Sequence, residues 1–150
     1  MSATAPQDKL ARQPLIASWV AQMIGTLVLA AVVLAYVRSA GAPFAISGES
    51  EWRKYAMVGI LGSIAPALLY LRTFKRRLNA DEAAALARGF PDPGLRALLR
   101  KGLAIGGALC EIPMAMGVVQ LFLGGDTRWF FGATLITIAL RLSYRPFNKD

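Results

Sequence analysis

Histidine is absent from this sequence of 150 residues, and cysteine occurs once, as Cys110. The absence of histidine removes the most common general base and the most common protein ligand of zinc and haem iron. A single cysteine can form neither an intramolecular disulfide nor a Cys-x-x-Cys metal or redox motif. The sequence also shows no arrangement of a nucleophile beside a base. We therefore expect a protein that is not an enzyme and that carries no metal and no cofactor.

Charged residues are scarce at 17%, whereas hydrophobic residues make up 55% of the chain. The apolar residues gather in four runs, at 13–37, 55–71, 102–125 and 129–140, and Glu111 is the single charge within them. A hydrocarbon core about 30 Å thick is crossed by roughly 20 helical residues. The pattern predicts one membrane domain over 1–150, an all-α integral membrane bundle of four transmembrane helices, and argues against a soluble enzyme, a secreted disulfide scaffold and a disordered chain. The predicted spans are about 14–37, 55–71, 99–123 and 129–144, with a cytoplasmic loop at 72–98.

Acidic residues are few, 9 against 17 Lys and Arg, and the distribution of the basic residues predicts an orientation. With a cytoplasmic N-terminus, thirteen of the seventeen lie inside: two before the first span, eight from Arg72 to Lys101 and three from Arg141 onward. Basic residues resist translocation, so both termini are predicted to be cytoplasmic, in a bacterial inner membrane. The net charge of +8 then follows from this orientation and from the attraction of basic residues to anionic lipid headgroups. Arg141, in the last turn of its predicted helix, is expected to reach those headgroups. We expect the lipid bilayer as a partner and no nucleic acid, because no aromatic interleaving or binding motif accompanies the charge.

The predicted cytoplasmic loop has features of its own. Asn79, with Glu82 three residues later, is typical of a helix start, and Gly89 is typical of a helix end. Residues 91–94, Pro-Asp-Pro-Gly, predict a turn before an amphipathic stretch that leads into the third span. We interpret the loop as a connector on the membrane surface, with a binding site for a partner protein as the alternative.

Glu111 is the most informative position. It follows Lys101 by ten residues, which places it about 15 Å deep at 1.5 Å per residue. A charged side chain at that depth costs at least about 3 kcal/mol, so the carboxyl group must face other helices or a wet cavity. Pro113 predicts a kink beside it, because proline cannot donate to the carbonyl of Leu109. Small residues at spacings of three and four predict close helix packing along the same helix, at Gly102, Gly106, Cys110, Pro113 and Gly117.

Three polar residues on the other spans lie at a comparable predicted depth, roughly 12–16 Å from the inner surface. They are Gln22, Ser63 and Thr134, and with Glu111 they form a predicted buried polar layer. Two roles are open for the acid. Glu111 is either a structural acid that holds the bundle together by hydrogen bonds, or an exchangeable proton or cation site.

The run Ala108-Leu-Cys-Glu-Ile-Pro-Met-Ala115, the Gly124-Gly125-Asp126 turn and the terminal Tyr144-Arg145-Pro146 resemble a family of small uncharacterised four-helix bacterial membrane proteins. The resemblance covers about the last third of the chain. The same hairpin is similar to the proteolipid c subunit of rotary ATP synthases, which implies a proton-carrying role for Glu111. Here the acid lies in the first helix of its hairpin, whereas in the c subunit it lies in the second.

The functional prediction from the sequence is a non-enzymatic inner-membrane protein, an accessory or assembly component. It would act as a homo-oligomer or with another membrane protein. The alternative is proton or cation handling through Glu111, by analogy with the c-subunit hairpin.

Overall fold

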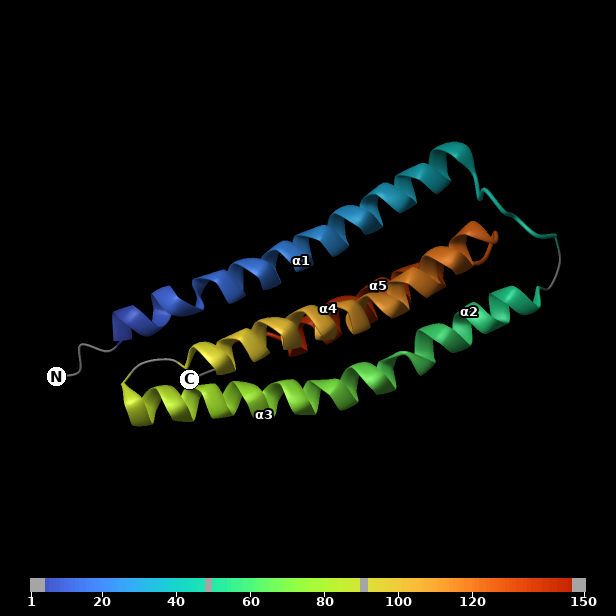
Figure 1. Ribbon diagram of the computed structural model, residues 1–150. Coiled ribbons are helices and arrows are strands. Elements are labelled where there is room, and N and C mark those ends of the chain that lie inside the picture. Colours follow the sequence, from blue (N-terminus) through green and yellow to red (C-terminus); the bar gives the residue numbers. More distant parts are fainter. Residues whose placement is uncertain (1–4, 48–49, 90–91, 147–150) are drawn as a thin grey trace.

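The computed structural model describes residues 5–47, 50–89 and 92–146, and of residues 5–12 only the backbone. Every regular element in these ranges is an α-helix (Figure 1). The helices are α1 (Ala5–Ala40), α2 (Glu51–Gly62), α3 (Ile64–Arg88), α4 (Pro93–Phe122) and α5 (Thr127–Ser143). The predicted all-α class is confirmed.

Four rods make up the fold, because α2 and α3 follow one another with only Ser63 between them (Figure 1). The beginning of α1, the end of α3, the beginning of α4 and the end of α5 share one end of the bundle, which we call the tail end. The α1–α2 connection and the α4–α5 turn lie at the opposite end, which we call the loop end. Consecutive rods are therefore antiparallel.

Helix α4 is the centre of the bundle. Of the most apolar 18-residue stretch of each long rod, 44% is buried in α4, 22% in α2–α3 and 11% in α1. The predicted small-residue face of α4 is the buried one, and its glycines admit close neighbours. A Cβ atom on Gly117 would lie 2.8 Å from Cβ of Ala133, on α5. The predicted packing role of this face is confirmed.

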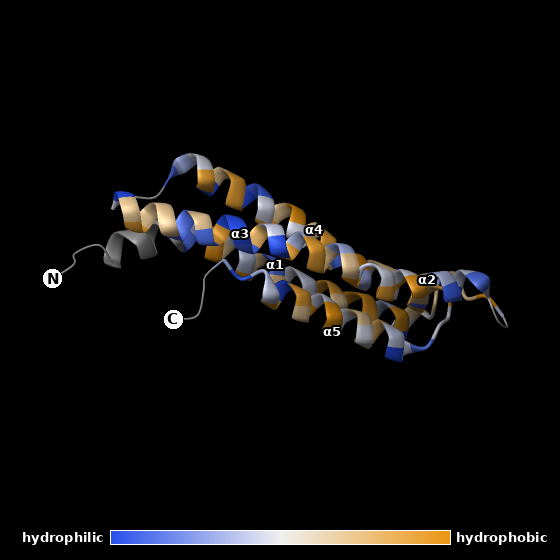
Figure 2. Cartoon of the chain, turned by 90° about the horizontal axis from the view of Figure 1, so that it is seen from below, coloured by the Kyte–Doolittle hydropathy of each residue, from blue (hydrophilic) through white to orange (hydrophobic). Residues whose placement is uncertain are grey.

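Large hydrophobic side chains remain exposed on every rod, so the bundle is apolar outside as well as inside. Seven of them belong to α1: Val20, Ile24, Leu27, Val28, Leu29, Val32 and Tyr36. In Figure 2, hydrophilic colours concentrate on α3 and on the first turns of α4 and return at the loop end, at the beginnings of α2 and α5, and hydrophobic colours prevail between the two ends. Three rods, Gln13–Ala40, Glu51–Arg88 and Pro93–Phe122, are long and apolar enough to cross a membrane. Helix α5, with 17 residues, is about 25 Å long.

The helices extend beyond the predicted spans. Helix α1 begins at Ala5, and most of the stretch predicted as a loop, 72–98, is helical. The predicted helix start at Asn79 is wrong, because α3 already runs through this residue from Ile64. The predicted end at Gly89 is confirmed: its φ of 75° is a left-handed conformation that favours glycine, and its N–H donates to the carbonyl of Ala85. Pro91 lies outside the described residues.

The interruption of helical structure falls at Ser63 and not beside Glu111. Pro66, in the first turn of α3, has no N–H to donate to the carbonyl of Gly62, which separates α2 from α3. Helix α4 is continuous through Pro113 to Phe122, and the kink expected at Pro113 stays a prediction.

Candidate functional site

Glu111 is held by an ion pair with Arg141. One of its carboxylate oxygens, Oε1, accepts a hydrogen bond from Nε of Arg141 at 3.0 Å and a second, short one from Nη2. The Arg141 side chain is 6% exposed and that of Glu111 33% exposed. Hydrogen bonds between two ionised groups are stronger than neutral ones, and the planar guanidinium suits a carboxylate. The pair therefore joins α4 to α5 in the interior of the bundle.

Helix α1 completes this cluster with two polar side chains. Oγ1 of Thr26 donates to Oε1 of Glu111 at 2.7 Å, and Nη1 of Arg141 donates to Oε1 of Gln22 at 2.6 Å. Trp19 lies one turn before Gln22, and its Nε1 donates to the backbone carbonyl of Arg141 at 2.8 Å. Arg141 thus has contacts to both α1 and α4, and three rods meet at one guanidinium group.

A glycine on α4 makes this approach possible. A Cβ atom on Gly107 would lie 2.5 Å from Oε1 of Gln22, closer than real side chains approach one another. Only glycine leaves room for the amide of Gln22 against the backbone of α4. Close backbone approach through small residues is the usual packing of helices in a membrane.

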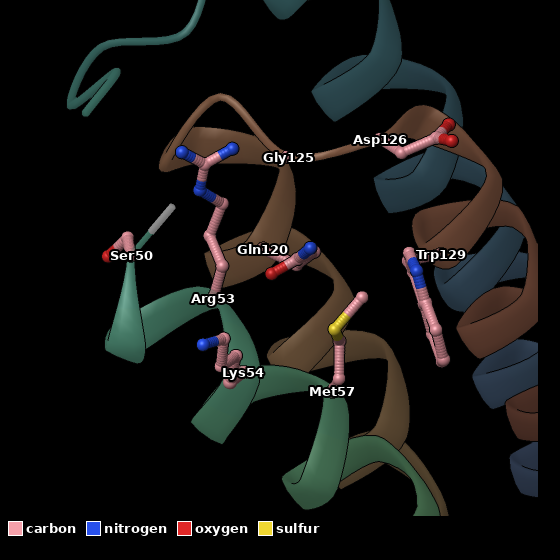
Figure 3. Close-up of a pocket in the computed structure, with 8 residues that line it drawn as sticks. All are labelled: Ser50, Arg53, Lys54, Met57, Gln120, Gly125, Asp126 and Trp129. Carbon is pink, nitrogen blue, oxygen red and sulfur yellow. The ribbon is translucent and has the colours of Figure 1, made fainter. Parts of the chain in front are cut away.

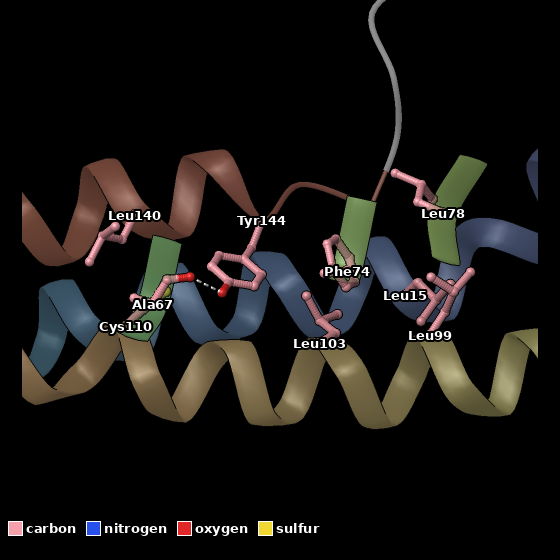
Figure 4. Packing of buried hydrophobic residues seen from close by; sticks show 9 residues of the cluster. All are labelled: Leu15, Ala67, Phe74, Leu78, Leu99, Leu103, Cys110, Leu140 and Tyr144. Atoms are coloured by element: carbon pink, nitrogen blue, oxygen red, sulfur yellow. Dashed lines mark hydrogen bonds between the residues drawn. The ribbon is translucent and has the colours of Figure 1, made fainter. Parts of the chain in front are cut away.

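The last turn of α5 also reaches α3. The hydroxyl of Tyr144 donates to the backbone carbonyl of Ala67, and the pair is drawn with a dashed line in Figure 4. The ring lies against Phe74, with centroids 5.5 Å apart, and over Gly106, where an added Cβ atom would overlap Cε1 of Tyr144. Arg141 and Tyr144 together bind the end of α5 to all three other rods.

The structure brings only part of the predicted polar layer together. Gln22 reaches the Glu111 cluster through Arg141. Ser63 and Thr134 are buried, but their hydroxyl groups donate to their own helices, to the carbonyls of Ile60 and Phe130. A layer inferred from depth alone could not separate these cases, because depth does not tell which side of a helix a residue occupies.

Sequence reasoning missed Arg141 and Thr26. The expectation that Arg141 reaches the headgroups is wrong, because its side chain turns inward to Glu111. A signal for the pair is present in the hairpin turn. Glu111 lies 13 residues before Gly124, and Arg141 lies 16 residues after Gly125, so an antiparallel hairpin places the two within about one helical turn of each other.

The chemistry available to this cluster is that of a neutralised pair. The carboxylate oxygen Oε1 is already occupied by donors from Arg141 and Thr26. Cys110, beside Glu111, is a free cysteine and is fully buried, as the predicted packing role requires. In the part of the chain that the structure describes, no group of three or more Cys, Asp and Glu residues could hold a metal ion.

No family model matches this chain, and no curated protein and no solved structure matches it either.

Proposed function

We propose that this chain is an integral membrane protein of a bacterial inner membrane that crosses the bilayer four times and acts as a non-enzymatic accessory or assembly component. Three apolar rods with exposed hydrophobic side chains support insertion, since such surfaces are stable only against lipid or another protein. The fourth crossing would be α5, whose 17 residues reach the lower limit of helix lengths that span a bilayer.

The ion pair between Glu111 and Arg141 is the observation that favours a structural role for Glu111, and with it an accessory or assembly component, over ion handling. An acid that carries protons or cations through a membrane must change its charge or exchange its partner. Here Oε1 of Glu111 is occupied by a guanidinium from the same chain, which stays charged at every physiological pH. The arrangement favours a Glu111 side chain that holds helices together over one that exchanges a proton or a cation.

The distribution of basic residues supports the orientation. Eight Lys and Arg residues lie between Arg72 and Lys101, on the parts of α3 and α4 that approach the tail end. A bilayer placed over the apolar part of the rods leaves these segments outside it as a basic helical hairpin. By the positive-inside rule the tail end would be cytoplasmic, together with both termini.

Accessibility to a thiol reagent that does not cross membranes tests insertion and orientation together. Single cysteines replace Ser47, at the loop end, and Ala87, near the end of α3, in a Cys110→Ala background. In sealed inverted inner-membrane vesicles, we expect the cysteine at 87 to be labelled and that at 47 to be protected until detergent is added. Intact spheroplasts should give the opposite pattern. Extraction of the protein by alkaline carbonate would contradict insertion, and equal labelling at both positions would contradict the proposed topology.

Proton or cation handling through Glu111 is the second candidate, and one observation favours it. A third of the Glu111 side chain remains exposed in spite of the ion pair. In reconstituted vesicles, this function requires a pH-linked flux, or a reaction with a carbodiimide, that Glu111→Gln abolishes while the fold survives. If the unmodified protein shows no such flux and no such reaction, this candidate is ruled out.

A further inference from the structure

A second polar site lies at the loop end, away from the Glu111 cluster. A pocket of about 260 Å³ opens between α2, α4 and the start of α5 (Figure 3). Its lining side chains combine two cations, one acid, one amide and an indole ring, and they come from Ser50, Arg53, Lys54, Met57, Gln120, Asp126 and Trp129, with Gly125 at the turn. The apolar runs begin directly beside it, at Tyr55 and Trp129. In an inserted bundle this is the level of the lipid headgroups.

Gln120 is the residue that points to a ligand. The side chain is 2% exposed, it lines the pocket, and its Oε1 atom has no hydrogen-bond partner among the described residues. A buried amide oxygen without a donor keeps the cost of its lost hydration, so such atoms are normally satisfied by protein, water or ligand. A carbonyl oxygen accepts only, and the missing partner must therefore be an N–H or O–H group.

Charged side chains of both signs line the same pocket as Gln120. Arg53 and Lys54 lie on the α2 side of the pocket, and the Asp126 carboxylate lies on the α5 side (Figure 3). Two other charged groups face them: Glu51 pairs with Lys54 at 3.3 Å, and Arg128 lies 4.0 Å from Asp126. The two cations suit a phosphodiester, whereas Asp126 and the Gln120 oxygen suit an ammonium group.

We propose that this pocket binds the zwitterionic headgroup of phosphatidylethanolamine. The phosphate would lie against Arg53 and Lys54, and the ammonium N–H groups would reach Oε1 of Gln120 and the Asp126 carboxylate. Trp129 occupies the interfacial position where indole rings collect in membrane proteins. The proposal rests on the membrane insertion proposed above.

Phosphatidylcholine gives the critical comparison, because it carries the same phosphate but no N–H donor. We would measure binding of dioleoyl phosphatidylethanolamine and dioleoyl phosphatidylcholine to the full-length protein in detergent, by titration and native mass spectrometry. We expect a roughly fivefold to tenfold preference for phosphatidylethanolamine, the ratio that one satisfied hydrogen bond produces. Equal affinity for the two lipids would overturn the proposal.

Three variants test which residues produce the preference for phosphatidylethanolamine. In Gln120→Met, which keeps the side-chain length and removes one of the two proposed acceptors, the preference for phosphatidylethanolamine should fall to what the Asp126 carboxylate alone supports, while the affinity for phosphatidylcholine is unchanged. Arg53→Gln should weaken both lipids by a similar factor, because both carry the phosphate. The matched control is Arg38→Gln, which removes an exposed cation from the last turn of α1, at the same end of the bundle and outside the pocket lining, and should leave both affinities unaltered. A preference that is undiminished in Gln120→Met would contradict the assignment.

Two further measurements are needed. One distinguishes a lipid from a soluble headgroup as the ligand, and the other distinguishes failure of this inference from failure of the proposed function. Free phosphoethanolamine should not displace the lipid at equal concentration; if it does, the ligand is a soluble headgroup and the lipid assignment is wrong. A protein that resists carbonate extraction but shows no lipid preference loses this inference alone. A protein that carbonate extracts loses the proposed membrane function as well. Each variant is first checked for helical content and thermal stability.

Discussion

Glu111 and Arg141 are 30 positions apart in the chain, and neither charge would be tolerated alone in an apolar interior. Each side chain supplies what the other needs, with Gln22 and Thr26 occupying part of the remaining hydrogen-bonding capacity. Removing one partner of a buried pair is therefore expected to cost more than removing both. This asymmetry distinguishes a structural pair from two independent polar residues.

A double-mutant cycle tests the pair. We expect Glu111→Gln to lower the free energy of unfolding in detergent by about 3–5 kcal/mol, because it leaves the buried Arg141 guanidinium without its partner, and Arg141→Gln to lower it by less, because the Glu111 side chain is 33% exposed. The double variant should lose less than Glu111→Gln alone, and therefore less than the sum of the two. The control pair is Glu51→Gln with Lys54→Gln, an exposed ion pair of the same chain, for which we expect about 0–1 kcal/mol. Additive losses for the buried pair would exclude the coupling.

Gly106 is a second residue for which the structure makes a sharp prediction. A methyl group there would overlap the Tyr144 ring, and the ring cannot move freely because it is buried and bound to Ala67. Gly106→Ala should lower the free energy of unfolding by about 1–3 kcal/mol, the usual cost of overpacking. Gly132→Ala is the matched control, because nothing lies within 4 Å of a Cβ atom on Gly132. It should gain up to about 1 kcal/mol of helix propensity. Equal stability of the two variants would show that Gly106 has more space than the structure indicates.

The ends of the helices show which elements could be predicted from sequence. Gly89 ends α3 because a left-handed residue is needed there, and glycine is the residue that adopts it without strain. Asn79 and Glu82 also form a valid local start signal, but α3 arrives at this point already helical, so no new start is required. Local capping signals are reliable only where the preceding chain is not helical, which the sequence around Asn79 does not reveal.

Asp92 is the start signal that α4 uses, and it predicts a pH dependence. Its Oδ1 accepts from the backbone N–H groups of Gly94 and Leu95, and these bonds, with the nearby Arg88, lower the pKa of Asp92 below its ordinary value. A lowered pKa means that the cap is complete above the unfolded-state pKa of about 3.9 and is lost as the pH falls through the lower, folded-state pKa.

Hydrogen exchange measures this directly. In the unmodified protein, protection of the Gly94 and Leu95 amides should hold down to about pH 4 and decrease below it, after correction for intrinsic rates. Asp92→Asn should keep the protection and remove its pH dependence, because asparagine caps equally well and does not titrate. Asp92→Ala should lose protection at every pH. An acid-induced loss that persists in Asp92→Asn would assign the titration to another group.

At the scale of the whole molecule, the sequence predicted the composition of the bundle better than its internal contacts. Length and hydropathy were sufficient to predict long apolar helices, and to predict that the Glu111 carboxyl group contacts other helices. The partner of that acid was not predicted, because distance from the helix end placed Arg141 near the surface. Its real environment depends on how α4 and α5 face each other across Gly124 and Gly125. Which sides of α4 and α5 contact each other is a property of the assembled hairpin, and it cannot be inferred from the sequence of one helix alone.

Helix α1 poses the corresponding question for assembly, because it is the least buried rod. From Gln13 to Ala40, only Leu15, Thr26 and Val33 are buried, whereas most of its large side chains are exposed. In a membrane, apolar side chains pack against lipid nearly as well as against another helix, so apolar contact alone does not fix α1 in place. The polar contacts of Trp19, Gln22 and Thr26 are then what orients this rod.

Removing two of those contacts should therefore loosen α1 while the other rods stay together. We expect Gln22→Leu combined with Thr26→Val to broaden the distance distribution between spin labels at positions 24 and 135, on α1 and α5. The free energy of unfolding should fall by about 1–2 kcal/mol, since interhelical hydrogen bonds in membranes contribute about 0.6–1.7 kcal/mol each. The control is Thr134→Val, whose hydroxyl donates within α5, and which should leave the distribution unchanged. A narrow distribution in the Gln22–Thr26 variant would mean that apolar packing alone positions α1, and the Glu111 cluster would then join α4 to α5 without determining where the first helix lies.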